Sequence, residues 1–301
     1  MTSGLSLAEA LQRLPRLGQP LEVTELPGGL TNHNYRVRTP THDVVVRISP
    51  PGTELLAIDR EHEWHNSTVA ASVGVGAPVV EYLPGEGVLV VGFLPGRTYG
   101  PDDVAANLPR VAAAARRLHG GPEFASRFDM FEVQRGYLRI VRDRGYAVPE
   151  GYDALAPAAA RVEAALASRP EPLVPCHNDL LAANVLDDGG DLRFIDYEYS
   201  GMNDACFELG NIWSESNLSL PQLDELVGHY YGENLANKVA RARLWGLMSK
   251  YGWTLWASIQ DGVSHIDFDF WTWGMEKYDR AVAEFDGPDF DRLVEDVQRS
   301  D

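Results

Sequence analysis

The pattern of apolar and polar positions divides the chain into a first third that predicts β-strands and a longer remainder that predicts helices. Short runs of β-branched and aromatic residues, bounded by Gly, Pro and Asp, are typical of strands. The predicted strands are Leu21–Leu26, Asn34–Arg38, Val44–Ile48, Val79–Leu83 and Val88–Leu94. Among them, Thr53–Val73 has apolar residues at helical spacing and predicts a single main helix. The last two strands are expected to form a hairpin.

A connector rich in Pro and Gly, residues 95–101, separates this part from the helical remainder. Asp102–His119 is rich in Ala, and helices are predicted to continue to about Arg169. Residues 173–196 predict a short strand, a loop and a second strand, and helices follow to the end. The sequence therefore predicts an α+β fold of two lobes with a ligand-binding cleft between them. The predicted lobes are 1–94 and 102–301, joined by a linker at 95–101.

The charge balance narrows the class of ligand. The chain of 301 residues carries 26 Lys and Arg against 44 Asp and Glu, which gives a net charge of −18. This excess argues against nucleic acid, whose phosphates require a basic surface. It is compatible with a cationic ligand, although solubility alone would explain it equally well. No apolar run approaches the roughly 18 residues that a membrane span needs, so no membrane association is predicted.

The N-terminal segment and the cysteines indicate a cellular location. The sequence MTSGLSLAEALQRL lacks the basic start and the continuous apolar stretch of a signal peptide. Cys176 and Cys206 are the only cysteines, and they have neither CxxC nor metal-site spacing. A reduced, cytoplasmic protein is the simplest interpretation. No feature of the sequence indicates an oligomeric state.

The most specific motif is CHNDLLAANVL, residues 176–186, followed by RFIDYEYSG, residues 193–201. Asp179 and Asn184 belong to the pattern H-x-D-x-x-x-x-N, and Asp196 ends the next apolar run. In a kinase catalytic loop of this kind, Asp179 would orient the substrate hydroxyl or accept its proton. Asn184 and Asp196 would hold Mg²⁺ on the nucleotide phosphates. A polar loop between two strands would contain similar residues, but the full pattern in a two-lobe chain predicts phosphoryl transfer.

The first third of the chain supplies candidate nucleotide-binding residues. A glycine turn lies between two predicted strands, where backbone amides could cover phosphates. Its candidate residues are Gly28, Gly29, Thr31 and Asn32. Arg47, in VVVRI, stands where a protein kinase has its phosphate-pairing Lys, and Glu63 in the following helix could pair with it. The alternatives are an ordinary hairpin turn, a surface Arg and a solvated Glu.

Together these motifs resemble the choline/ethanolamine kinase family, within the larger group of aminoglycoside phosphotransferase-like kinases. The resemblance covers nearly the whole chain and includes GGLTNHNYRV at 28–37 and the R-x-x-E-x-x-N pattern at 60–66. It implies a protein-kinase-like fold in which lobe 1–94 binds ATP with Mg²⁺ and lobe 102–301 carries catalysis and substrate binding. Aminoglycoside kinases share the catalytic loop, so this motif alone does not choose the alcohol acceptor.

The resemblance also suggests how a cationic substrate would be bound. Glu198 and Glu215 match positions where family members keep carboxylates near an amine. Trp253 and Trp256 fall near the helix face opposite an apolar stripe, together with Gln260. The positions that match the family's aromatic box are Tyr199, Trp253, Trp256, Phe268, Phe270 and Trp273. Aromatic faces attract a quaternary ammonium group, and the alternative is packing at a second helix interface.

The sequence therefore predicts an ATP-dependent small-molecule kinase that phosphorylates the hydroxyl of a small cationic alcohol, with choline as the leading candidate. Leu181 stands where some family members have Gln, and Phe270 and Trp273 stand where Tyr is common. These departures leave the identity of the substrate's cationic head group undecided. The alternatives are ethanolamine, a dimethylated amino alcohol, thiamine or an aminoglycoside, the last of which needs carboxylates over a wider site. A pseudokinase that senses nucleotide or quaternary amine is the non-catalytic alternative.

Overall fold

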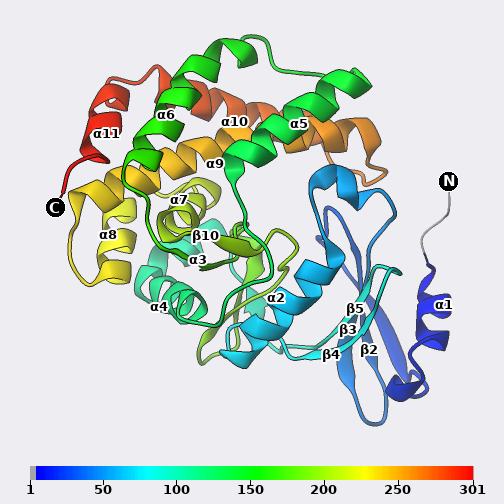
Figure 1. Ribbon diagram of the computed structural model, residues 1–301. Coiled ribbons are helices and arrows are strands. Elements are labelled where there is room, and N and C mark those ends of the chain that lie inside the picture. Colours follow the sequence, from blue (N-terminus) through cyan, green and yellow to red (C-terminus); the bar gives the residue numbers. More distant parts are fainter. Residues whose placement is uncertain (1–4, 301) are drawn as a thin grey trace.

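A five-stranded antiparallel sheet forms one end of the molecule, and a larger helical part forms the rest (Figure 1). The computed structural model describes residues 5–300, so residues 1–4 and 301 of the predicted lobes lie outside the described residues. The strand order is β1-β2-β3-β5-β4. The strands are β1 (Glu22–Leu26), β2 (His33–Arg38), β3 (Asp43–Ile48), β4 (Val79–Leu83) and β5 (Val88–Gly92). The predicted strands and fold class are confirmed.

The helical part is built around one long central helix, α9 (Ala236–Val263), which packs against α5, α7, α8, α10 and α11. Its residues are buried on all sides over most of its length. The other helices are α1 (Leu7–Gln12), α2 (Arg60–Ser72), α3 (Pro101–Ala106), α4 (Leu108–His119), α5 (Met130–Arg144), α6 (Ala156–Ser168), α7 (Ala205–Glu215), α8 (Leu220–Tyr231), α10 (Phe270–Phe285) and α11 (Phe290–Asp296). Short 3₁₀ turns are Pro15–Leu17, Thr53–Leu56, Tyr152–Leu155 and Ala182–Asn184.

Short strands carry the segments between the lobes. The connector contains β6 (Arg97–Thr98), which pairs with β8 (Val185–Asp187), and β8 pairs in turn with β9 (Leu192–Phe194). A second small ladder joins β7 (Leu173–Cys176) to β10 (Gly201–Asp204). The predicted catalytic loop therefore leaves β7 and enters β8, with a ladder at each end that fixes its position.

Side-chain alternation along β3 gives the sheet two different faces. Val44, Val46 and Ile48 are buried against the segment that contains α1 and the first 3₁₀ turn. Val45 and Arg47 alternate with them and point to the opposite face, which lines the cleft. A strand has a side-chain period of two, so burial of one set of valines orients Arg47 toward the cleft.

Two predicted helices are interrupted, and those expectations were wrong in extent. The helix expected over Thr53–Val73 is a 3₁₀ turn followed by α2, which begins only at Arg60. Ala57 has a φ of 60°, and the Asp59 side chain caps α2 by accepting from the backbone N–H of Glu61 at 2.9 Å. The helix expected over 102–119 is divided at Asn107, because Pro109 has no N–H with which to continue the first helix.

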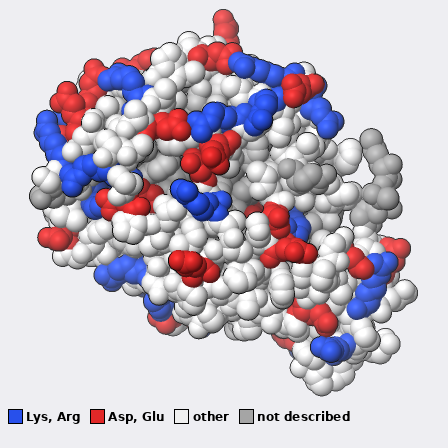
Figure 2. All heavy atoms as spheres, viewed as in Figure 1, with Lys and Arg blue, Asp and Glu red and all other residues white. Residues whose placement is uncertain are grey.

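The face of the molecule shown in Figure 2 carries charges of both signs. Figure 2 shows acidic and basic side chains interspersed over the face in view, with no continuous basic area. Over the described residues, none of the helices has both the length and the apolar character that crossing a bilayer requires.

The contact between α7 and α9 depends on two glycines. A Cβ added to Gly210 would lie 2.1 Å from the carbonyl oxygen of Ala242 and 2.6 Å from the amide nitrogen of Gly246. We expect Gly210→Ala to lower the free energy of unfolding by about 1–3 kcal/mol, because the two backbones must separate. Urea denaturation measures this change.

The matched control for that variant is Gly136→Ala, in the interior of α5. A Cβ at Gly136 meets no atom within 4 Å. This substitution should raise the free energy of unfolding by about 0.5–1 kcal/mol, because Ala has the higher helix propensity. Equal effects of the two substitutions would contradict the close approach of α7 and α9.

Candidate active site

A cavity of about 650 Å³ lies between the sheet and the predicted catalytic loop. Its walls come from the glycine turn, the cleft-facing side of β3 and β5, the connector and the segments on either side of the β8–β9 hairpin. The predicted site residues that line it are Gly28, Gly29, Arg47, Asn184 and Asp196. Its apolar lining includes Val45, Leu89 and Phe194. An apolar slot with charged groups at one end suits a nucleotide, whose base is flat and whose phosphates are anionic.

The glycine turn can adopt its shape only with glycine at two successive positions. Gly28 has a φ of 102°, a backbone conformation that residues with a Cβ avoid. A Cβ at Gly29 would lie 2.5 Å from the carbonyl oxygen of Asn32. The tight backbone therefore comes close to the cavity, as a phosphate-covering turn requires.

Arg47 joins the sheet to both α2 and the segment after β9. Its guanidinium is paired with the carboxylates of Glu63 and Asp196, and the Arg47 and Glu63 side chains are almost completely buried. Burial opposes the charged form of Arg47, but the two carboxylates outweigh it and raise its pKa. The predicted Arg47–Glu63 pair is thus present, and Arg47 also forms an ion pair with Asp196.

Thr31 and Asn32 lie behind the cavity rather than on its wall. The Glu198 carboxylate accepts hydrogen bonds from the Thr31 hydroxyl at 2.7 Å and from the Asn32 amide at 2.8 Å. Arg60 on α2 bonds to Glu198 at 3.1 Å and to Glu63 at 2.6 Å. The structure therefore groups Glu198 with the nucleotide-side residues and not with the aromatic set with which the sequence associated it.

Asp179 lies in an acidic, partly closed environment. Its pKa is raised well above the ordinary value by burial and by the nearby charges of Glu215, Asp196 and Glu198, while Lys277 acts in the opposite direction. A carboxylate with a raised pKa is a stronger base. The arrangement is suited to taking a proton from a bound hydroxyl.

His177 connects Asp179 to the segment that carries Asp196. Its Nε2 lies 2.8 Å from the carbonyl oxygen of Ile195, and its Nδ1 accepts from the backbone N–H of Asp179 at 3.3 Å. Burial lowers the pKa of the His177 ring, which keeps it neutral with the proton on Nε2. One imidazole therefore joins the two backbone segments that carry the predicted catalytic carboxylates, Asp179 and Asp196.

Two residues on α7 hold the backbone of the catalytic loop, and sequence reasoning did not single them out. Glu208 accepts from the backbone N–H groups of His177 at 2.7 Å and Asn178 at 2.8 Å. Asn211, one helical turn later, accepts from the N–H of Leu180 at 2.8 Å. A Glu among the apolar residues of ACFELGNIW was the available signal, because a fully buried carboxylate requires partners.

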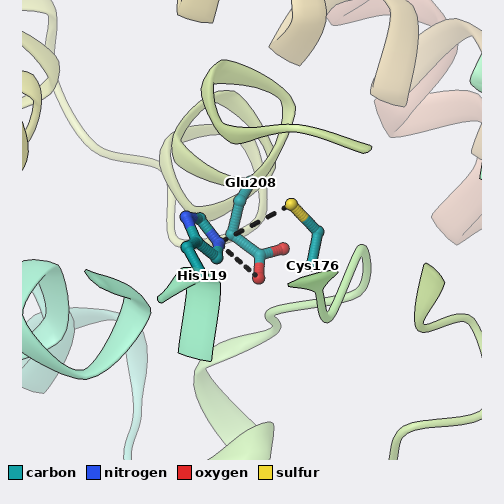
Figure 3. A group of neighbouring side chains, drawn as sticks. All are labelled: His119, Cys176 and Glu208. Atoms are coloured by element: carbon teal, nitrogen blue, oxygen red, sulfur yellow. Dashed lines mark hydrogen bonds and ion pairs between the residues drawn. The ribbon is translucent and has the colours of Figure 1, made fainter. Parts of the chain in front are cut away.

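The buried group His119, Cys176 and Glu208 lies directly beneath this loop (Figure 3). The His119 Nε2 lies 3.6 Å from both the Cys176 sulfur and a Glu208 oxygen. Metal-ligand residue types are thus close together, but each Glu208 oxygen already accepts a loop N–H, and burial raises the pKa of the Cys176 thiol. We interpret the group as support for the loop rather than as a metal centre.

Asn184 and Asp196 are the residues that fit a magnesium ion. The Asn184 side-chain amide donates to the carbonyl oxygen of Asp179 at 2.8 Å, which leaves its own oxygen available at the cavity wall. The Asp196 carboxylate lines the same cavity. Carboxylate and amide oxygens are ligands that Mg²⁺ accepts, with water and phosphate completing its shell.

The predicted aromatic residues are gathered on α9 and around its C-terminal half. The indole N–H of Trp256 donates to the Tyr199 hydroxyl at 2.7 Å, and the Tyr199 and Trp253 rings meet edge to face at 4.9 Å. All three side chains are buried. Gln260, on the same side of the helix, donates to the carbonyl oxygen of Leu30 beside the glycine turn at 2.9 Å. Asp179 also contributes to the raised pKa of Tyr199, whose main cause is burial.

The remaining aromatic residues extend this cluster onto α10. Trp256 contacts Phe270 at 5.8 Å and Trp273 at 5.5 Å between ring centroids. Phe268 contacts Phe270 at 4.9 Å, but it is 41% exposed whereas Phe270 is buried. The segment is not an extended strand, because α10 begins at Phe270. The structure thus brings all six predicted aromatic residues into one continuous cluster, and their role as ligand contacts stays a prediction.

Glu215 ends α7 beside this cluster, and it already has a partner. Both of its oxygens bond to the Lys277 ammonium, at 2.7 and 2.5 Å. The Lys277 nitrogen also lies 4.1 Å from the centre of the Trp273 ring. Sequence reasoning did not identify Lys277, which only the packing of α10 against α7 brings to Glu215.

Comparison with known proteins identifies the class that this fold and site define. Residues 22–245 match the model of the phosphotransferase enzyme family, so the chain belongs to that family. A crystal structure of a choline/ethanolamine kinase family protein from Mesorhizobium loti is 31% identical, with a TM-score of 0.84 over 97% of this chain and 98% of that chain. The chain is a member of the choline/ethanolamine kinase family, and hence a small-molecule kinase.

Other relatives carry the names of both kinds of kinase. Protein LicA of Haemophilus influenzae is 29% identical over 78% of this chain and 72% of its own length. Ethanolamine kinase 2 of Rattus norvegicus is 29% identical over 79% of this chain and 68% of its own length. Choline kinase LicA of Streptococcus pneumoniae shares the fold, with 24% identity and a TM-score of 0.80 over 93% of this chain and 99% of that chain. These names do not decide between the two substrates.

Neutralising the predicted catalytic carboxylates Asp179 and Asp196 should have different effects on turnover and on nucleotide affinity. Asp179→Asn should lower kcat by roughly 10²–10⁴-fold and leave nucleotide affinity nearly unchanged, because it removes only a positioned base. Asp196→Asn should weaken Mg²⁺-dependent nucleotide binding as well as turnover. Asp191→Asn, at an exposed carboxylate in the β8–β9 turn, is the control. Steady-state kinetics with calorimetric nucleotide titration measures both, and near-normal turnover in either variant contradicts the assignment.

Lys250 is a buried lysine on α9, deep in the helical part. Its nitrogen has no hydrogen-bond partner among the described residues and lies 3.9 Å from the centre of the Trp213 ring. Burial, and to a smaller extent Arg280, lowers its pKa from 10.5 to about 7. Lys277 acts in the same direction, and Glu284 and Glu215 oppose it. The folded protein therefore holds this proton more weakly than the unfolded chain does.

This difference predicts how stability depends on pH. Between the folded pKa of about 7 and the unfolded value of 10.5, the unfolded state binds more protons, so this lysine makes stability rise with pH. Lys250→Met removes that contribution. The unfolding free energy of Lys250→Met should exceed that of wild type most at pH values near the folded pKa of about 7. The difference should shrink as the pH approaches 10.5. Denaturant titrations across this window test it, and parallel stability profiles would contradict it.

Proposed function

We propose that the protein transfers the γ-phosphoryl group of ATP to the hydroxyl of choline. The observation that carries this proposal is the continuous aromatic cluster around Tyr199 and Trp256, next to the predicted base Asp179. A desolvated aromatic surface attracts a quaternary ammonium group without hydrogen bonds. The cavity lined by Asn184 and Asp196 has the size and lining for a nucleotide.

The residues of the chain would divide the reaction between them. The glycine turn and Arg47 would position the nucleotide phosphates, and Asp179 would accept the proton of the choline hydroxyl. The choline oxygen then bonds to the γ-phosphorus as the bond from that phosphorus to the leaving ADP oxygen breaks. Asn184 and Asp196 would hold Mg²⁺, which neutralises charge on the phosphate oxygens when bound. Such a reaction depends on positioning and charge stabilisation, and few side chains suffice.

The chemistry of the aromatic cluster and its neighbours favours a quaternary over a primary ammonium group. A primary ammonium group brings three N–H donors, each of which needs an acceptor once it is buried. Leu181, Phe270 and Trp273 offer no side-chain acceptor. Both oxygens of Glu215 already bond to Lys277. A trimethylammonium group has no donors and makes no such demand.

Ethanolamine is the second candidate, because several relatives are named ethanolamine kinases. It differs from choline only in the three methyl groups on nitrogen. A panel of choline, ethanolamine, the dimethylated amino alcohol, thiamine and an aminoglycoside, with ADP release as the measurement, ranks the candidates directly.

The decisive test separates charge from shape. In 3,3-dimethylbutanol a carbon replaces the nitrogen of choline, so the molecule keeps the shape and loses the charge. A desolvated cation–π contact is worth about 2 kcal/mol or more, and several rings act together, so choline should have at least roughly a 30-fold higher kcat/KM. Trp256→Leu should reduce the kcat/KM for choline much more than for the neutral alcohol, because it removes a π face and keeps an apolar side chain.

Trp64→Leu provides the matched control for that variant. Trp64 is 42% exposed and stacks on Tyr82 at the surface of the first lobe. Its replacement should leave the preference for choline over the neutral alcohol unchanged. Equal use of the two alcohols by the wild-type protein would refute the choline proposal, since the aromatic residues would then serve only in packing.

A further inference from the structure

An ammonium group of the protein itself lies in the predicted cation site. Lys277 follows Trp273 by one helical turn on α10, so the two side chains lie on the same face. The Lys277 nitrogen is 4.1 Å from the centre of the Trp273 ring and within 2.7 Å of both Glu215 oxygens. The Lys277 and Glu215 side chains are only 6% and 4% exposed. A ring face and a carboxylate, the two features that would bind an amine, are therefore both taken.

This pair belongs to the same charged environment as the predicted base. Glu215 raises the pKa of Asp179, after the larger effect of burial, and Lys277 lowers it. Lys277 also contacts Trp273, a member of the aromatic cluster that continues through Trp256 to Tyr199. The pair is therefore connected to the predicted acceptor site by direct contacts.

The pair affects primary and quaternary ammonium groups differently. A primary ammonium group gains most from a free carboxylate, because hydrogen bonds to a charged acceptor are the strong ones. Lys277 occupies that acceptor with the same chemical group, an R–NH₃⁺. A quaternary ammonium group makes no hydrogen bond and can use the faces of Tyr199, Trp253 and Trp256 instead.

We propose that Lys277 is a specificity-determining residue that selects quaternary over primary ammonium alcohols by occupying the Glu215 carboxylate. The proposal rests on the proposed function, since it concerns the amine end of the same acceptor. Lys277 also lowers the pKa of Asp179, an effect that every alcohol shares, so the choice of head group is measured by the ratio between two substrates.

The test compares the ratio of kcat/KM for choline to that for ethanolamine in wild type and in Lys277→Met. Removal of the lysine frees Glu215 and takes away a like charge that opposes both substrates. Only ethanolamine gains new hydrogen bonds, so the ratio should fall by at least about tenfold. The kcat/KM for the neutral alcohol 3,3-dimethylbutanol reports the change that reaches the reaction through Asp179 alone, because this alcohol has no head-group charge.

Three further variants separate selection from structure. Lys277→Arg keeps the charge and the contact with Glu215, and should keep the wild-type ratio. Lys277→Gln removes the charge but retains a hydrogen-bond donor. It replaces Lys277→Met in the same measurement if Lys277→Met does not fold. The double variant Lys277→Met with Glu215→Gln should return the ratio toward wild type, because the freed carboxylate is gone. Calorimetric binding of methylammonium and tetramethylammonium should show the same shift without turnover.

The outcomes distinguish this proposal from the function on which it rests. If wild type uses choline and 3,3-dimethylbutanol equally, the proposed function fails whatever the variants do. If wild type prefers the cation and the ratio in Lys277→Met stays within about threefold of wild type, the role of Lys277 is refuted and the function stands. A loss of equal size for both amines, as a purely structural role would cause, refutes it as well.

Discussion

The arrangement of the site depends on the rule that a charge removed from water must meet a partner. Arg47 is almost completely buried and bridges Glu63 on α2 and Asp196 after β9. Breaking such a bridge by removing one partner is strongly destabilising, because it leaves an uncompensated buried charge. The sheet, α2 and the catalytic segment are thereby held in one register. The predicted nucleotide cavity lies between these segments, with Arg47 and Asp196 in its lining.

The same rule explains how the predicted catalytic loop is held in place. A loop that passes through the interior exposes backbone N–H groups that need acceptors. Glu208 supplies both of its oxygens to two of them, and Asn211 supplies a third acceptor from the same helix face. Because α7 packs tightly on α9 through Gly210, the loop is anchored to the central helix of the helical part. Asp179 therefore owes its position in part to Glu208 and Asn211, which do not line the cavity.

Local patterns in the sequence predicted the strands and the catalytic motif, because their information lies within a few residues. Alternation along VVVRI orients Arg47, and the spacing from Asp179 to Asn184 defines the loop. Composition did not predict where α2 begins, because the chain turns at Ala57 and the Asp59 side chain then caps the helix. Lys277 could not be predicted at all. Its partner is 62 residues away on another helix, and nothing in its own neighbourhood indicates burial.

The predicted nucleotide and acceptor ends of the site differ in how their buried charges are paired. At the predicted nucleotide end, Arg47 and Arg60 are shared among three carboxylates, those of Glu63, Asp196 and Glu198, and magnesium would add positive charge to this network when bound. At the acceptor end, one carboxylate is closed off by one lysine, and the remaining surface is aromatic. An aromatic surface tolerates a cation without specifying hydrogen bonds. Under the proposed role of Lys277, selectivity at that end would follow from which acceptors are withheld, since a buried donor without a partner costs more than an absent one.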